Sequence, residues 1–182
     1  MIVKVLINAL GITDSGGIVV LDKALAECTA DKSIKIFIVC NFNDHIRKLK
    51  DKYKEFDFIL VRSGIIYRVF YENIIFRRLV KKYNIQLVYN FTGSAQLNFF
   101  LNTMQLTKIQ NLHFYSRTLE AVYHSKKAYY KWLKEIFFKR LYFKFMLGYS
   151  KDIEVQSKHV KDCFSNFINI KKKIFYIKSD ID

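Results

Sequence analysis

The sequence predicts a single α/β domain built on a mainly parallel, doubly wound sheet. Short apolar runs alternate along the chain with segments of helix length, which is the pattern of consecutive β-α-β units. About half of the 182 residues are hydrophobic, so a full core can be buried without a disulfide or a structural metal. The length fits one domain, and we expect residues 1–182 to form it.

Each strand is predicted from a run of β-branched and apolar residues. In chain order the strands cover Ile2–Asn8, Ile34–Cys40, Asp57–Val61, Ile85–Tyr89, Lys108–Tyr115, Asp152–Gln156 and Ile174–Ile177. Helices are predicted over 18–28, 45–54, 67–83, 95–101, from Thr118 or Ala121 to Leu147, and over 158–167. Gly148 is the predicted C-cap of the long helix and Ser157 the N-cap of the last one. Ligands of such a sheet bind at the carboxyl ends of its strands.

The positive charge is concentrated in the middle of the chain. The net charge is +15, and residues 73–151 carry 14 basic and 2 acidic side chains. Residues 1–72 carry 11 basic and 9 acidic ones, and residues 152–182 carry 6 and 5. This imbalance indicates an anionic partner. Because no apolar run approaches the ~18 residues of a spanning helix and no secretory leader is visible, we expect a cytoplasmic protein that is peripheral to the inner face of the membrane.

Several kinds of chemistry have no motif in this sequence. The cysteines Cys28, Cys40 and Cys163 form no CxxC pair and have no zinc-ligand spacing, so we expect reduced, buried thiols and no metal site. Neither the dinucleotide fingerprint nor the P-loop fits the loop after the first strand, and no cofactor is expected. Catalysis by His113 or His124 is not expected, because the sequence places no partner carboxylate beside either.

The turn after the first predicted strand contains two adjacent glycines. It reads NALGITDSGGI from Asn8 to Ile18, with Gly16 and Gly17 at the start of the predicted helix. Without a Cβ, these residues let backbone N–H groups approach a phosphate or a sugar. A purely structural tight turn explains the pair equally well, so both interpretations stay open.

The order of several features along the chain resembles one enzyme family. The SGG turn is followed by the segments Asn90-Phe91-Thr92-Gly93 and Ser116-Arg117-Thr118-Leu119-Glu120, a long basic helix, and Val155-Gln156-Ser157 before the last helix. The chain then ends in Ile181-Asp182. This order resembles the N-terminal domain of GT-B glycosyltransferases, in particular the retaining, family 4-like group of lipopolysaccharide and capsule enzymes. Lys178-Ser179-Asp180 stands where that family usually has Pro-Asn-Gly.

The resemblance implies a Rossmann-like domain that binds the acceptor in bacterial sugar transfer. A nucleotide sugar would be the donor, and a cell-envelope polysaccharide or a lipid-linked sugar at the membrane surface the acceptor. In the family the donor is held mainly by a C-terminal domain, so we expect residues 1–182 alone to be inactive and to need that domain or a partner chain. A truncation, a broken gene and a split enzyme all remain open.

Six residues are expected to line the acceptor site: Gly16, Gly17, Asn90, Thr92, Arg117 and Glu120. The segment around Arg117 is similar to a cleft-facing Arg-Asn-x-Glu-like segment of the family, and its guanidinium could bind a phosphate or a sugar hydroxyl through two hydrogen bonds. The alternatives are a surface ion pair between Arg117 and Glu120 and a structural turn at Asn90. No catalytic residue is assigned.

Residues 126–149 combine seven basic, one acidic and nine aromatic side chains. At helical spacing, Tyr130, Leu133, Phe137 and Leu141 form an apolar stripe, and Lys127, Lys131 and Lys134 lie on another face. One interpretation is a helix packed into the core with a solvated basic face. The second is a surface that meets anionic lipid, with Trp132 at headgroup depth. The third is a non-catalytic module that binds nucleic acid through interleaved basic and aromatic side chains, although no such motif is present.

Overall fold

The computed structural model describes residues 2–12, 15–62, 64–96, 103–109, 117–167 and 174–176. Their strands form one sheet in the order β3-β2-β1-β4-β5-β6-β7, and every neighbouring pair is parallel. The predicted α/β fold with a doubly wound parallel sheet is therefore confirmed. The strands are β1 (Val3–Ala9), β2 (Ile34–Asn41), β3 (Asp57–Val61), β4 (Leu87–Asn90), β5 (Met104–Ile109), β6 (Asp152–Val155) and β7 (Ile174–Tyr176).

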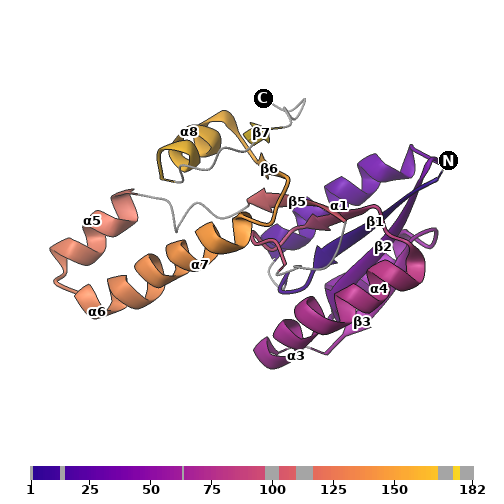
Figure 1. The fold of residues 1–182 in the computed structure, drawn as a ribbon, viewed down its shortest axis with the longest axis horizontal. Helices are drawn as coiled ribbons and strands as arrows, with labels where there is room; N and C mark the ends of the chain where they lie inside the picture. The colour runs from indigo at the N-terminus through magenta and orange to yellow at the C-terminus, as the bar shows by residue number, and fades with distance from the viewer. Residues whose placement is uncertain are drawn as a thin grey trace.

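The helices lie on both faces of the sheet (Figure 1). One face carries α1 (Ser15–Thr29) and α2 (Asp44–Lys52). The other carries a continuous helix that consists of α3 (Ile65–Phe70), the π-helical turn η1 (Tyr71–Ile75) and α4 (Phe76–Tyr83). After β5 come α5 (Arg117–Ser125), α6 (Tyr129–Trp132), the π-helical turn η3 (Leu133–Phe137) and α7 (Phe138–Leu147), and α8 (Lys158–Phe167) precedes β7.

Alternation of side chains along β1 divides the core into two layers. Ile7 packs in the layer with Leu21 and Leu25 of α1, whereas Leu6 packs in the opposite layer with Phe76 of α4. All five side chains are buried. A parallel sheet covered on both faces buries its central strands completely, which explains why β1 and β2 are unbroken apolar runs in the sequence.

The strand order reverses between β1 and β4. The first two crossovers lead from β1 outward to β2 and β3, and the continuous helix 65–83 then returns the chain to the other side of β1. In open α/β sheets, such a switch point at the carboxyl ends of the strands is where ligands bind. The β1–β4 edge is therefore the expected position of a ligand site.

One predicted strand is misplaced. β5 begins at Met104, four residues before the predicted start at Lys108. Its side chains that point into the protein include Gln105 and Thr107, and this buried polarity hides the strand in the sequence. Residues 110–116 lie outside the described residues, as does most of the predicted helix 95–101, of which Ala95 and Gln96 are not helical.

The long predicted helix is interrupted and folds back on itself. α5 ends at Ser125, and Lys127 has a left-handed φ of 52° before α6 begins. Residues 117–147 together form a helical arm that leads away from the sheet (Figure 1). The arm ends at Gly148, the predicted C-cap, and the Val160 N–H donates to the hydroxyl of Ser157, as expected for the N-cap of α8. Within the described ranges, no helix combines the length and the apolar character needed to cross a bilayer.

Candidate functional site at the switch point of the sheet

Two asparagines lie side by side at the carboxyl ends of β1 and β4. Asn8 and Asn90 are register partners, and the Asn8 Nδ2 donates to the Asn90 Oδ1 at 3.3 Å. The same Nδ2 lies 3.1 Å from the Glu72 Oε1, and the Asn8 Oδ1 accepts from the Leu10 N–H at 3.1 Å. Both asparagines are fully buried. Because a buried amide without partners is costly, this pairing fixes the edge in one arrangement.

A second group of amides holds the loop after β4. The Asn90 Nδ2 donates to the Gln105 Oε1 at 3.1 Å, and the same oxygen accepts from the Gln96 N–H at 2.9 Å. The Gln96 Nε2 in turn donates to the Asn90 Oδ1 at 3.1 Å. The Gln96 Oε1 and the Thr92 Oγ1 are buried oxygens without a hydrogen-bond partner among the described residues. The loop therefore keeps acceptor capacity beside a rigid polar cluster.

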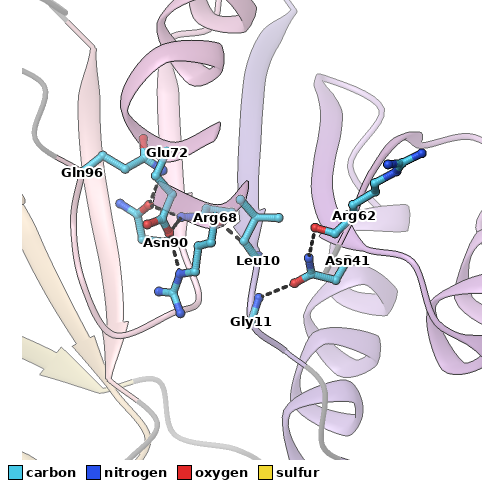
Figure 2. Close-up of polar contacts among 9 residues, drawn as sticks. Leu10, Gly11, Asn41, Arg62, Arg68, Glu72, Asn90 and Gln96 are labelled. Carbon is cyan, nitrogen blue, oxygen red and sulfur yellow. Dashed lines mark hydrogen bonds and ion pairs between the residues drawn. The ribbon is translucent and has the colours of Figure 1, made fainter. Parts of the chain in front are cut away.

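An arginine reaches this cluster from the continuous helix. The Arg68 Nε forms an ion pair with the Glu72 Oε1 at 3.2 Å, one turn along the helix. Figure 2 shows Arg68, Glu72 and Asn90 converging at the end of the sheet, with Leu10 and Gly11 beside them. A Cβ placed on Gly11 would lie 2.8 Å from Arg68 Nη1, so the absence of a side chain at Gly11 makes room for the guanidinium.

The backbone of Gly11 is held from the other side. Its N–H donates to the Asn41 Oδ1 at 2.8 Å, and the Asn41 Nδ2 donates to the Arg62 carbonyl oxygen at 3.2 Å (Figure 2). Gly11 has a φ of 88°, a conformation that residues with side chains rarely adopt. An asparagine is thus the last residue of β2 and β4 and the last but one of β1, and each of the three bonds a neighbouring loop or strand.

α7 of the helical arm lies within electrostatic reach of the Arg68–Glu72 pair. Burial raises the pKa of the Tyr142 hydroxyl, the Glu72 carboxylate raises it further, and the Arg68 guanidinium lowers it. Phe143 of the same helix lies 3.9 Å from the position of a Cβ on Gly93, in the loop after β4. The switch-point edge is therefore bordered by the continuous helix, the loop after β4 and α7.

The structure separates the six predicted acceptor residues into two groups. Gly16 and Gly17 lie in the first turn of α1, which begins three residues earlier than predicted. Asn90 is the last residue of β4, and Thr92 lies in the loop that follows it. The Asn90 side chain is buried inside the amide cluster, where it holds the loop. Arg117 and Glu120 lie in α5, in the arm that leads away from the sheet (Figure 1).

Glu120 makes its contacts within the arm. Its Oε2 accepts from the Arg140 Nη1 at 2.9 Å, and its Oε1 accepts from the Trp132 Nε1 at 3.3 Å. Trp132 is half-buried, and its ring also lies beside those of His124 and Phe137, at centroid distances of 5.2 and 5.8 Å. These contacts join α5 to the rest of the arm. The predicted role of Glu120 in acceptor binding stays a prediction.

The apolar stripe of the arm faces solvent, contrary to the interpretation of a helix packed into the core. Tyr130 is 78% exposed, and Leu133, Phe137 and Leu141 are exposed as well. The buried residues of this segment are others, including Ile136, Met146 and Leu147. Lys127, Lys131 and Lys134 are exposed, as expected from the basic face. The arm therefore presents aromatic and cationic side chains together.

Buried ionisable groups elsewhere are paired inside the protein. The Lys108 Nζ lies 2.6 Å from the Glu154 Oε1, with exposed side-chain fractions of 14% and 3%, and the Tyr89 hydroxyl donates to the other oxygen of Glu154. Burial, followed by the charge of Glu154, raises the pKa of Tyr89.

The described cysteines form no disulfide: Cys40 is a buried thiol and Cys28 a partly buried one. His113 lies outside the described residues, and within them no group of three or more His, Cys, Asp or Glu residues is arranged to hold a metal ion.

Solved structures contain the same fold. A glycosyltransferase from Rickettsia africae ESF-5 superimposes with a TM-score of 0.57 and 16% identity, over 100% of this chain and 44% of that one. The fold of this chain is thus found in a glycosyltransferase. HepE from Anabaena, solved in complex with UDP and glucose, superimposes with a TM-score of 0.65 and 10% identity, over 99% of this chain and 45% of that one. The chain spans less than half the length of either protein.

Comparisons by sequence add no relative. No family model matches the chain, and a comparison with curated proteins finds no similar sequence. At 16% and 10% identity, the structural similarity shows a shared fold, which does not by itself carry an activity.

Proposed function

We propose that this chain is the acceptor-binding half of a glycosyltransferase that acts at a membrane surface. The observation that carries the proposal is the polar cluster at the β1–β4 switch point, built from Asn8, Arg68, Glu72 and Asn90. It lies where ligands bind in this architecture, and the architecture is shared with a glycosyltransferase and with a protein solved with UDP and glucose. The buried Asn8 and Asn90 hold this edge in place, and the partly exposed Arg68 guanidinium can donate hydrogen bonds to sugar hydroxyls.

The proposed chemistry is sugar transfer from a nucleotide sugar, with the donor held mainly by a second domain or partner chain. Transfer requires donor and acceptor in near-attack geometry, and one sheet edge supplies one side of that arrangement. In this scheme the first turn of α1, with Gly16 and Gly17, directs backbone N–H groups and the positive end of the helix dipole at the reacting diphosphate. The finer assignment, to lipopolysaccharide or capsule synthesis in bacteria by a retaining, family 4-like enzyme, rests on the sequence resemblance.

The helical arm supports a place at the inner face of the membrane. Its exposed aromatic and aliphatic side chains lie on the same segment as exposed lysines, the combination that places a helix in the headgroup layer of an anionic leaflet. Tyr129, Tyr130, Phe138, Leu141, Tyr142 and Phe145 are all at least half exposed. A net charge of +15 adds long-range attraction to such a surface.

Ligand binding by the 182-residue chain tests the proposal against the nucleic-acid alternative, which the shared fold does not favour. Saturation-transfer NMR with a panel of mono- and oligosaccharides should detect binding, and a gel shift with an arbitrary oligonucleotide should give only weak, salt-sensitive retention. Binding of the oligonucleotide with no saccharide signal would favour the nucleic-acid module instead. Transfer of labelled sugar from UDP-glucose should require a donor-binding half supplied in trans.

A further inference from the structure

The ion pair with Glu72 occupies only one part of the Arg68 guanidinium. Glu72 contacts its Nε and leaves the outer edge of the guanidinium, Nη1 and Nη2, unbonded. Within the described ranges, no other ion pair or side-chain hydrogen bond involves this guanidinium, and one third of the side chain is exposed. The group therefore retains both terminal nitrogens as donors toward a ligand.

The support behind Arg68 is rigid. The Glu72 side chain is only 11% exposed, and its Oε1 also accepts from the buried Asn8 Nδ2 at 3.1 Å. Glu72 belongs to the π-helical turn η1, a distortion that is frequent at functional sites. A row of hydrogen bonds thus connects Asn90 and Asn8, at two neighbouring strands, through Glu72 to the Arg68 guanidinium. Such support fixes the orientation of a side chain that binds a ligand.

The surroundings of Arg68 suit an anion. The N-terminus of the 15-residue α1 follows β1 at the same edge of the sheet, and its dipole favours negative charge. Because Gly11 has no Cβ, the Arg68 guanidinium lies close against the turn after β1, which leads to that helix. The two terminal nitrogens of a guanidinium can each donate to one oxygen of the same phosphate, whereas a hydroxyl has a single, uncharged oxygen.

We propose that Arg68 binds a phosphate monoester carried by the acceptor, at the β1–β4 edge. The inference rests on the proposed function and narrows its acceptor to phosphate-bearing molecules. A soluble sugar phosphate and a lipid headgroup share this chemistry. Exposed apolar side chains near Arg68 favour the lipid source: Tyr67 and Phe70 in α3 and Ile74 in η1.

Calorimetric titration with glycerol 3-phosphate, a soluble phosphate monoester, tests the site. Arg68→Gln should lower the affinity by at least roughly tenfold, because a bidentate charged contact is lost. Arg68→Lys should recover only part of it, since an ammonium is a point charge. Arg62→Gln is the matched control: it removes the same charge from a side chain at the same sheet edge that points away from Arg68 (Figure 2), and its affinity should stay within about twofold.

Several outcomes would overturn the inference. Arg68 would be excluded as the binding residue if the wild type did not detectably bind glycerol 3-phosphate. The same would follow if Arg68→Gln left the affinity unchanged, or if Arg62→Gln lowered the affinity as much as Arg68→Gln. Circular dichroism and urea unfolding of each variant separate misfolding from loss of contact. If Arg68→Gln unfolds, Arg68→Lys retains the charge and gives the same comparison.

Vesicles distinguish the two sources of the phosphate. Phosphatidic acid carries a phosphate monoester and phosphatidylglycerol only a diester, so vesicles of each are compared at equal surface charge. A loss of phosphatidic acid binding in Arg68→Gln, with unchanged phosphatidylglycerol binding, supports a lipid acceptor. A loss confined to glycerol 3-phosphate supports a soluble one. Neither assay involves sugar transfer, so a phosphate site at Arg68 can be confirmed even if the proposed function fails. Saccharide binding without phosphate binding would support the proposed function and exclude a phosphate site at Arg68.

Discussion

Charge reversal on the helical arm should abolish the proposed attraction of the arm to anionic lipid. Lys127, Lys131 and Lys134 are exposed, and changing all three to Glu lowers the net charge from +15 to +9. A lysine near an anionic leaflet is worth about 1 kcal/mol, so loss of three costs about 3 kcal/mol, or roughly a hundredfold in partitioning, before repulsion by the new carboxylates is counted. The apolar stripe is untouched, so the circular dichroism should not change.

Co-sedimentation with phosphatidylglycerol vesicles, compared with neutral vesicles, measures this effect. The matched control changes Lys23, Lys48 and Lys81 to Glu, which removes the same charge from three exposed lysines on α1, α2 and α4. The control should lose far less affinity, because its lysines lie outside the arm. At about 1 M salt the difference between the two variants should vanish, since the screening length falls to roughly 3 Å. Equal vesicle binding by wild type and the arm variant, or equal losses in arm variant and control, would contradict the proposed contact.

Three further outcomes follow from particular contacts. Glu154→Ala should lower the free energy of urea unfolding by about 3–5 kcal/mol, because it strands the buried ammonium of Lys108, whereas Asp57→Ala, which breaks a half-exposed ion pair, should cost less than about 1 kcal/mol; similar losses would show that burial is not the cause. Burial raises the pKa of Cys40 to about 12, so at pH 8 its thiol should resist iodoacetamide until guanidinium unfolds the chain; rapid native labelling at Cys40, read by mass spectrometry, would contradict this. Gly17→Val should weaken saccharide binding without loss of stability, because Gly17 is already helical and valine has the higher helix propensity; unchanged binding would take the SGG turn out of the site.

The sheet was predictable from sequence where burial and hydrophobicity coincide. β3 has the predicted bounds, and each of β1, β2 and β6 differs from its prediction by at most one residue at either end. The central strands β1 and β2 are covered on both faces and are therefore apolar. β5 breaks this rule: the buried Gln105 side chain serves the amide cluster, so the strand has a polar residue where an apolar one is expected. The error in this strand is therefore a consequence of the site.

The candidate site was only partly predictable. Asn90 directly follows the predicted strand 85–89, and the SGG turn starts the helix that comes after the predicted strand 2–8. A parallel sheet places such strand ends at one edge. Arg68 and Glu72 were not predicted as site residues, because an arginine followed four residues later by a glutamate is an ordinary surface pair on a helix. Asn8, which bonds Glu72, lies 64 residues away along the chain, and only the crossover that returns beside β1 brings the two together. The available signal in the sequence was the asparagine at or next to the end of several predicted strands, which indicates a polar cluster at that edge of the sheet.

The helical arm shows a similar limit. The basic and aromatic composition of residues 126–149 was visible, but periodicity does not tell which apolar stripe is buried. The interruption at Lys127 lets α5 fold back, and the Glu120–Arg140 ion pair joins two segments 20 residues apart. Exposure of the stripe is thus a tertiary property.

Mapping a bound saccharide by NMR directly tests whether sugar binds at the switch point of the sheet. The 21.7 kDa chain is small enough for amide-resolved spectra, and the ligand is the saccharide that binds best in the panel. The shifted amides should cluster around the β1–β4 edge, at Gly11, Gly16, Gly17, Arg68 and Thr92. Shifts confined to the helical arm, or scattered over the surface, would contradict a sugar-binding site at the switch point of the sheet.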